Sequence, residues 1–170
     1  MKLWNKEDNL NIRIEKFTVG KDRHYDLYLA EYDIKATIAH AKMLHNIKIL
    51  THTELGNIIS ELKIIDNNIK IGKFTIEDDY EDVHSKIESI LVEKLGKIGK
   101  KIHTGRSRND QVLVATQLYL KNEICEIKLL TKSLFTSLIK LAKKNKKLLL
   151  PGYTHLQVAM PSSFGLWFSS

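Results

Sequence analysis

The densest group of chemically capable side chains in this sequence lies between His103 and Val112. This block has the sequence HTGRSRNDQV and holds two arginines, two hydroxyls, two amides and a carboxylate. Arginine is rare in the chain, yet Arg106 and Arg108 lie two residues apart here. A guanidinium can bind a carboxylate or phosphate through two parallel hydrogen bonds, which an ammonium cannot. The residue types therefore indicate an anion site, although they equally suit a solvated, capped loop.

The block leads directly into a segment with helical periodicity. Asp110 or Ser107 can cap the N-terminus of that helix, and its first N–H groups then point into the loop. A helix N-terminus beside arginine side chains favours anion binding. The predicted helix runs without glycine or proline from Asp110 to Asn145, so its 36 residues would span about 54 Å.

That length exceeds what a compact chain of 170 residues can cover, because such a domain is only about 40 Å across. We expect the apolar stripe of this helix to pack against other long helices. The stripe consists of Leu113, Leu120, Ile124, Ile127, Leu134, Leu138 and Leu141. Cys125, the single cysteine, lies in the same apolar segment, which predicts a packing role for its thiol.

Shorter elements must support the block from the N-terminal side. Residues 1–24 are polar and mixed, which predicts an extended arm with one short element. Three helices are expected to follow. They are a helix from about Asp26 to Asn46, a second opened by a Thr51–Glu54 capping box and ended by a turn at 66–68, and a third from near Asp79 to Leu95, ended by Gly96 and Gly99. Between the last two, 69–76 should be extended or irregular, and Pro161 should open a further helix.

The composition favours a globular protein, with 43% hydrophobic and 28% charged residues. No apolar run approaches the roughly 18 residues that a spanning helix needs, and no apolar signal segment follows Met1. We therefore predict a cytoplasmic protein with no membrane partner. The net charge of +7 raises the question of nucleic acid, but its densest run, 143–147, lies at a predicted helix end and has no interleaved aromatics. Nucleic-acid binding is not expected.

The block from His103 to Val112 resembles the first conserved block of argininosuccinate lyases, within the fumarase/aspartase superfamily. A second stretch, from Pro151 to Gln157, resembles that family's second block. Weaker similarities are found at 31–34, 39–41 and 81–84. The resemblance runs from Leu3 to the end of the sequence, and both blocks occur in the family's order.

The resemblance implies a mainly α fold. An N-terminal helical domain, 1–108, would lead into the first long helix of a central bundle. The part of the bundle present in this sequence would be 109–170. Family members are more than twice as long and form homotetramers whose sites combine residues from three subunits. We therefore expect this chain to be an N-terminal part, without the family's third block, a Gly-Ser-Ser loop that carries the favoured base.

The implied reaction is reversible elimination of argininosuccinate to arginine and fumarate, with no metal or other cofactor. By resemblance, Asn109 binds substrate, together with its neighbours Ser107 and Arg108. Thr154 matches a substrate-binding threonine, and His155 matches the histidine assigned to proton transfer, so these two are the catalytic candidates. His84 matches a histidine associated with the site. From residue type alone, His84 would be a helix-surface residue and His155 a loop histidine bonded to backbone.

Two other functions remain open from the sequence. The chain could belong to another lyase of the superfamily, such as adenylosuccinate lyase, although the arginine-rich wording of the first block favours argininosuccinate. It could also be a non-catalytic helical protein, either truncated or crystallin-like, because motifs can outlast activity. As a lyase, the chain alone is expected to be inactive, since the third block is missing.

Overall fold

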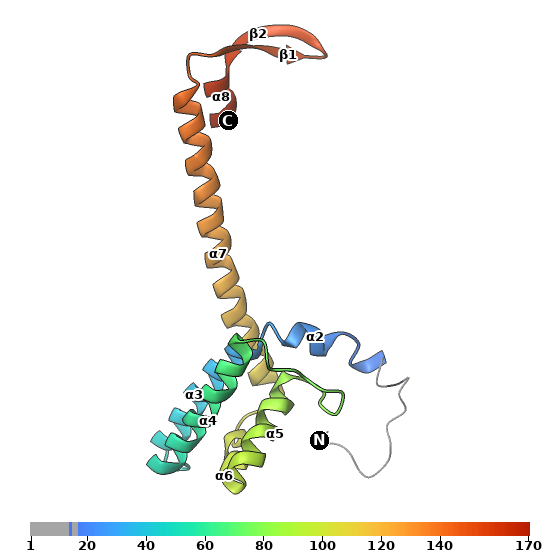
Figure 1. Cartoon of the computed structure of the whole chain (residues 1–170), viewed down its shortest axis with the longest axis vertical. Coiled ribbons are helices and arrows are strands. Elements are labelled where there is room, and N and C mark those ends of the chain that lie inside the picture. Colours follow the sequence, from blue (N-terminus) through green and yellow to red (C-terminus); the bar gives the residue numbers. More distant parts are fainter. Residues whose placement is uncertain (1–13, 15–16) are drawn as a thin grey trace. The chain divides into compact units, whose positions relative to one another are not determined.

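A computed structural model of the chain describes Ile14 and residues 17–170 (Figure 1). Within these residues helices dominate and the strands form a single two-stranded sheet, so the mainly α prediction is confirmed. The chain divides into two compact units, 1–120 and 121–170. The elements are α2 (Asp22–Asp26), α3 (Ala30–Asn46), α4 (His52–Lys70), α5 (Val83–Leu95), α6 (Lys97–Lys100), η1 (Lys101–His103), α7 (Arg108–Lys144), β1 (Leu149–Thr154), β2 (Gln157–Ser163) and α8 (Phe164–Ser169).

The first unit is organised around a core shared by α3, α4 and α5, with α3 and α4 packed side by side (Figure 1). Apolar residues at helical spacing supply the core, as Ile58, Leu62 and Ile65 do on α4. Each such side chain removed from water contributes about 1.5–3 kcal/mol. The other fully or almost fully buried members include Ala30, Ile34, Ala41, Leu44, Leu50, Val83, Ile87, Leu91 and Ile102.

Helix α4 begins as predicted and ends later than predicted. The Thr51 hydroxyl accepts the N–H of Glu54 at 3.2 Å, and the Glu54 carboxylate accepts the N–H of Thr51 at 2.8 Å, which completes a capping box. The turn expected at 66–68 is wrong, because α4 continues to Lys70. Ile69 prolongs the buried stripe into this turn, and an Asp66–Lys70 ion pair supports it.

Helix α3 starts at Ala30, four residues after the predicted start. The carboxylate of Asp26 instead accepts the N–H of Val83 at 3.1 Å, and residues 27–29 form turns before α3. Burial raises the pKa of Asp26, and the N–H of Val83 lowers it. Helix α2 supplies a short element in the predicted N-terminal arm, most of which lies outside the described residues. Of the stretch 69–76 that was expected to be extended or irregular, 69–70 belong to α4, whereas 73–77 lack regular structure, with Phe74 and Ile76 packed against the core.

Helix α5 begins at Val83, where Asp82 caps it by accepting the N–H of Ser85 at 2.7 Å. Gly96 ends the helix with φ of 59°, a left-handed conformation that favours glycine. The expectation that Gly99 also ends this helix is wrong. It lies inside α6, and a Cβ there would come within 2.3 Å of the Leu91 carbonyl oxygen, so Gly99 permits close packing on α5.

Helix α7 is one unbroken helix of 37 residues, about 55 Å long, and matches the predicted long helix within two residues at each end (Figure 1). Ala115 near its start is fully buried, and Tyr119 packs edge-to-face on Tyr32 of α3 with ring centroids 5.8 Å apart. Most of the predicted apolar stripe is exposed in the described chain. Cys125 is also exposed, so the packing role expected for its thiol is not found.

The second unit contains an antiparallel hairpin of β1 and β2, followed by α8. The expectation that Pro161 opens a helix is wrong, because Pro161 lies in β2 opposite Pro151. Ser163 caps α8 instead, with extended backbone and a hydroxyl that accepts the N–H of Leu166 at 3.1 Å. Gly165 brings α8 against the end of α7, since a Cβ there would lie 2.7 Å from Cα of Lys146.

Candidate functional site

The loop before α7 is closed by a reciprocal cap between Ser107 and Asp110. The N–H of Ser107 donates to Oδ2 of Asp110 at 2.8 Å, and the N–H of Asp110 donates to Oγ of Ser107 at 3.4 Å. Both residues that were expected as alternative caps are therefore used. The Ser107 N–H lowers the pKa of Asp110, with a smaller contribution from the Ser107 hydroxyl. Gly105, with φ of 63°, provides the left-handed turn that brings the loop to this cap.

Arg108 joins the start of α7 to the start of α5. Its Nε lies 3.1 Å from Oδ2 of Asp82, and its two terminal nitrogens donate to Oγ of Ser85 and Oε1 of Gln111, both at 3.1 Å. The planar guanidinium thus contacts three acceptors in different directions, which a lysine ammonium on a single flexible stem would not reproduce. Arg108 holds the loop against α5 in this arrangement.

His84 is buried, with 1% of its side chain exposed, so it is not a helix-surface residue. Its Nδ1 lies 2.9 Å from Oδ1 of Asp33 on α3. The guanidinium of Arg106 lies 3.7 Å from the same oxygen and donates to Oγ1 of Thr37 at 2.8 Å. Burial lowers the pKa of Arg106, and the charge of Asp33 opposes that shift. These residues line a small cavity shared with Gln111.

Ser107 and Asn109 are exposed at the entrance to α7. Arg108 lies between them, and its partner Ser85 directly follows His84 in α5. The structure therefore gathers four of the predicted site residues, Ser107, Arg108, Asn109 and His84, where the starts of α5 and α7 meet. An exposed amide and hydroxyl beside a helix N-terminus can bind an anionic group.

Thr154 and His155 lie together at the tip of the β1–β2 hairpin, in the second unit. Thr154 pairs with Gln157, so His155 and Leu156 form a two-residue turn, with φ values of 53° and 62°. Turns of this kind favour glycine and asparagine, and a left-handed conformation costs other residues about 1–2 kcal/mol each. Leu156 is 98% exposed, so no burial of its own side chain offsets that strain. Strained backbone of this sort is often found at functional sites.

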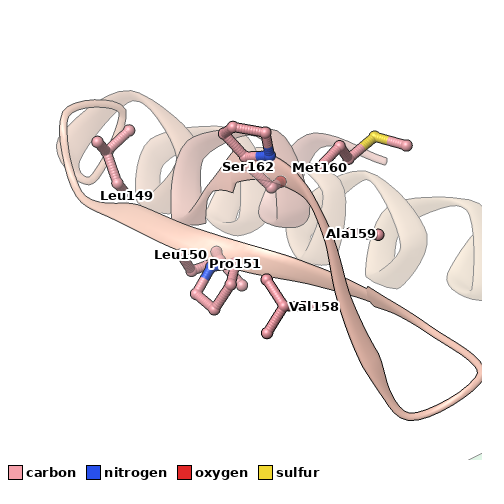
Figure 2. A pocket seen from close by; sticks show the side chains of 8 residues that line it. Leu149, Leu150, Pro151, Val158, Ala159, Met160 and Ser162 are labelled. Atoms are coloured by element: carbon pink, nitrogen blue, oxygen red, sulfur yellow. The ribbon is translucent and has the colours of Figure 1, made fainter.

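Residues of both strands of the same hairpin line an apolar hollow (Figure 2). Its lining comes mainly from Leu149, Leu150, Pro151, Val158 and Met160. No titratable side chain lines it, so it offers no group for proton transfer. None of the predicted site residues lines this hollow.

Two side chains of the buried cluster, Asp33 and Thr37, were absent from the sequence-based site, and Arg106, which was expected to contribute to an anion site in the loop, contacts them instead. A signal was present, because Asp33 and Thr37 are one helical turn apart within the apolar stripe of Ala30, Ile34 and Ala41. Polar residues at core positions of a helix mark a buried network or a site. Among the described residues no group of three or more His, Cys, Asp and Glu side chains is placed to hold a metal ion. No described helix is both long and apolar enough to cross a membrane.

The sequence is similar to those of known proteins from one family. A family profile described as Lyase matches residues 8–170. Argininosuccinate lyases from Bacteroides thetaiotaomicron and Phocaeicola vulgatus are 51% and 52% identical over 169 residues, and the one from Thermotoga neapolitana is 44% identical over 166. These alignments cover 98–99% of the chain but 38–42% of each relative, so the chain spans well under half of their length. The matched region includes both blocks and the residues around His84, and the chain belongs to the lyase family.

Proposed function

We propose that the chain is the N-terminal part of an argininosuccinate lyase. The observation that carries the proposal is sequence identity. About half of the residues are identical to relatives of that name across almost the whole chain, including both polar blocks. The reaction is the reversible elimination of argininosuccinate to arginine and fumarate. It needs firm binding of carboxylates, a base and an acid, and the proposed site uses side chains for these roles with no metal or other cofactor.

The binding roles fall to the first unit and to Thr154. Asn109 and Ser107 are exposed at the start of α7, where N–H groups and the helix dipole favour a substrate carboxylate. Arg108 holds these residues in place through Asp82, Ser85 and Gln111. His84 supports the same region from within the core. Thr154 supplies a hydroxyl from the hairpin tip.

The proton-transfer role falls to His155. In the elimination a base removes the proton from the carbon next to a carboxylate, and the electron pair of that C–H bond forms the new C=C bond. The C–N bond breaks, and its electron pair leaves with the guanidinium nitrogen of arginine, which is protonated. An imidazole ring can act as the acid or the base in such a step. His155 is exposed, so its imidazole is accessible to a substrate.

A second part of the proposal concerns the regions of the relatives that lie outside the matched segment. Relatives extend well beyond the region matched here, and we infer that the complete enzyme is a cytoplasmic homotetramer whose sites combine segments of several subunits. The exposed stripe on α7 supports this inference, because its leucines and isoleucines have no covering helix among the described residues. The chain alone is then expected to lack activity.

A direct test joins the chain to the C-terminal remainder of the Bacteroides thetaiotaomicron relative. The joined protein should convert argininosuccinate to fumarate, followed by the ultraviolet absorbance of fumarate, and the chain alone should not exceed a control without protein. Adenylosuccinate provides the matched comparison. Preferential turnover of adenylosuccinate would favour the other superfamily reaction, and a folded tetramer inactive on both substrates would favour a non-catalytic helical protein.

A further inference from the structure

The buried carboxylate of Asp33 lies where three segments of the first unit meet. It is fully buried on α3, with His84 of α5 at 2.9 Å and Arg106 of the loop at 3.7 Å, both measured to Oδ1. Arg106 also donates to Thr37, one helical turn along α3. A single carboxylate on one helix thus faces a side chain from a second helix and one from the loop before a third.

Stability alone does not account for this carboxylate. Neither oxygen of Asp33 has a partner with hydrogen-bond geometry in the described structure, and the Nδ1 of His84 also lacks one. A buried charge needs close, well-aligned partners to offset its loss of hydration, and a well-packed apolar residue is often as stable or more stable at such a position. Incompletely satisfied buried polar groups are uncommon and are found at functional sites.

The position of Arg106 connects Asp33 to the substrate-binding residues. Arg106 directly precedes Ser107, which in turn precedes Arg108 and Asn109. The backbone N–H groups of this loop bond to nearby residues of the chain: Thr104 donates to Lys101 at 3.0 Å, Arg106 to His103 at 3.3 Å and Ser107 to Asp110 at 2.8 Å. One backbone group reaches α3, because the carbonyl oxygen of Thr104 accepts from Nε2 of His40 at 3.1 Å. Gly105 adds a left-handed turn without a side chain. The guanidinium of Arg106 is the buried side-chain anchor of the loop on α3, and the exposed bond from His40 to the Thr104 carbonyl lies beside it.

We propose that Asp33 is a positioning residue, which holds Arg106 and thereby fixes the loop that presents Ser107, Arg108 and Asn109 to substrate. The inference rests on the proposed function in one respect, since it takes these three as substrate-binding residues. The anchoring itself is a property of this chain and can be measured without substrate. Asp33 touches no substrate in this arrangement and acts through Arg106.

The test is amide hydrogen exchange of the loop from Thr104 to Ser107, measured residue by residue on the whole chain. Asp33→Asn and Arg106→Gln should each raise exchange of these amides about tenfold or more, the scale of one lost hydrogen bond to a charged group. Loop exchange in the double variant should be only slightly faster than in either single variant, because both changes remove the same interaction. Arg106→Lys keeps a positive charge facing Asp33 and should restore part of the protection.

Glu54→Gln is the matched control. Its carboxylate pairs with Lys101 at 2.6 Å, just before the loop, but is not a partner of Arg106 or His84. This variant should leave loop exchange near that of the parent. If Asp33→Asn unfolds the first unit, Arg106→Gln and Arg106→Lys still decide the question. Additive effects in the double variant, or loop exchange unchanged in both single variants, would overturn the anchoring role and leave the proposed lyase activity intact. If the anchoring is preserved but the joined enzyme does not convert argininosuccinate, the proposed lyase activity is refuted and the anchoring role stands.

Discussion

The two units of this chain treat apolar side chains in opposite ways. In residues 1–120, leucines and isoleucines of α3, α4 and α5 enclose one another, and Leu62 is 0% exposed. In residues 121–170, side chains of the same type face outward, and Leu134 is 61% exposed. The first unit therefore has a core of its own, whereas the α7 stripe has the composition of a core and the exposure of a surface. Such a surface is typical of a segment that is completed by other helices.

The proposed site residues differ between the units in a parallel way. In the first unit they are held by ion pairs and hydrogen bonds from buried neighbours, as Arg108 and His84 are. In the second unit His155 stands on a strained, exposed turn. A rigidly held group is suited to binding, and an accessible imidazole is suited to proton transfer. Variants that separate binding from turnover can break or sharpen this comparison.

The largest effect is expected at His155 in the enzyme joined to the remainder of a relative. His155→Asn should lower kcat by about 10²–10⁴-fold with substrate binding retained, because asparagine keeps a hydrogen bond but cannot exchange a proton. Arg108→Lys should act mainly on KM, with a penalty of about 1.5–3 kcal/mol, since the guanidinium contacts to Asp82, Ser85 and Gln111 are lost. Steady-state kinetics distinguish the two. A harmless His155→Asn together with abolished turnover in Arg108→Lys would reverse the assignment.

A core substitution tests the difference in burial. Leu62→Ala should destabilise the first unit by about 2–5 kcal/mol, because it leaves a cavity among fully buried neighbours. Leu134→Ala, the matched change on the exposed stripe, should change stability by no more than about 0.5 kcal/mol. Native-state amide exchange of α3 measures the stability of the first unit in both variants. Equal effects from the two substitutions would contradict the comparison.

The elements of the fold that could be predicted from the sequence are those specified by local chemistry. Periodic apolar residues and the Thr51–Glu54 pair located α4, and an uninterrupted run located α7. The errors arose where tertiary contacts decided the outcome. Asp66 and two asparagines suggested a turn, yet Ile69 packs against the core and keeps α4 helical. Pro161 suggested a helix start, yet pairing with Pro151 places it in a strand.

The third prediction concerns the stripe on α7, which should drive self-association of the isolated chain. Leu134→Lys should weaken association at least about tenfold, because it places a charge in an apolar contact surface. Ser133→Lys adds the same charge one residue away from the stripe and should have little effect. Sedimentation or light scattering at several concentrations measures the association. A parent chain that stays monomeric at all concentrations would refute the role given to the stripe.

The site shows the same division between local and tertiary information. The two sequence motifs identified Ser107, Arg108, Asn109, Thr154 and His155 as candidates, and their roles remain a proposal. The pairing of Asp33 with Arg106 could not be predicted from spacing, because 73 positions separate the two residues along the chain. Nor did residue type indicate the left-handed turn at Leu156, a conformation that leucine seldom adopts. Tertiary contacts and backbone strain supply what local patterns omit.

The fourth prediction tests the strain at the hairpin tip. Leu156→Gly should stabilise the hairpin by about 1 kcal/mol, because glycine adopts a φ of 62° without steric cost. Amide exchange of Thr154 and Gln157 should slow by several-fold. Val158→Gly, at a strand position next to the turn, should instead speed exchange by loosening the strand. Faster exchange in Leu156→Gly would show that the turn is not strained.

The smallest effect concerns the capping box of α4, where a charge can be removed with little change in shape. Lys101 and the N–H of Thr51 lower the pKa of Glu54 from 4.5 to about 2. The depressed pKa means that ionised Glu54 stabilises the fold above about pH 4.5, and that this contribution is lost as the pH falls toward 2.

Glu54→Gln keeps an N3 side chain able to cap, so it isolates the charge. Its thermal midpoint should lie below that of the parent at neutral pH and converge with it near pH 2, and added salt should reduce the gap. Glu93→Gln, whose carboxylate lies 3.8 Å from Lys94 on the surface, is the control and should follow the parent throughout. A constant gap between Glu54→Gln and the parent at every pH would assign the effect to the cap's shape and not to its charge.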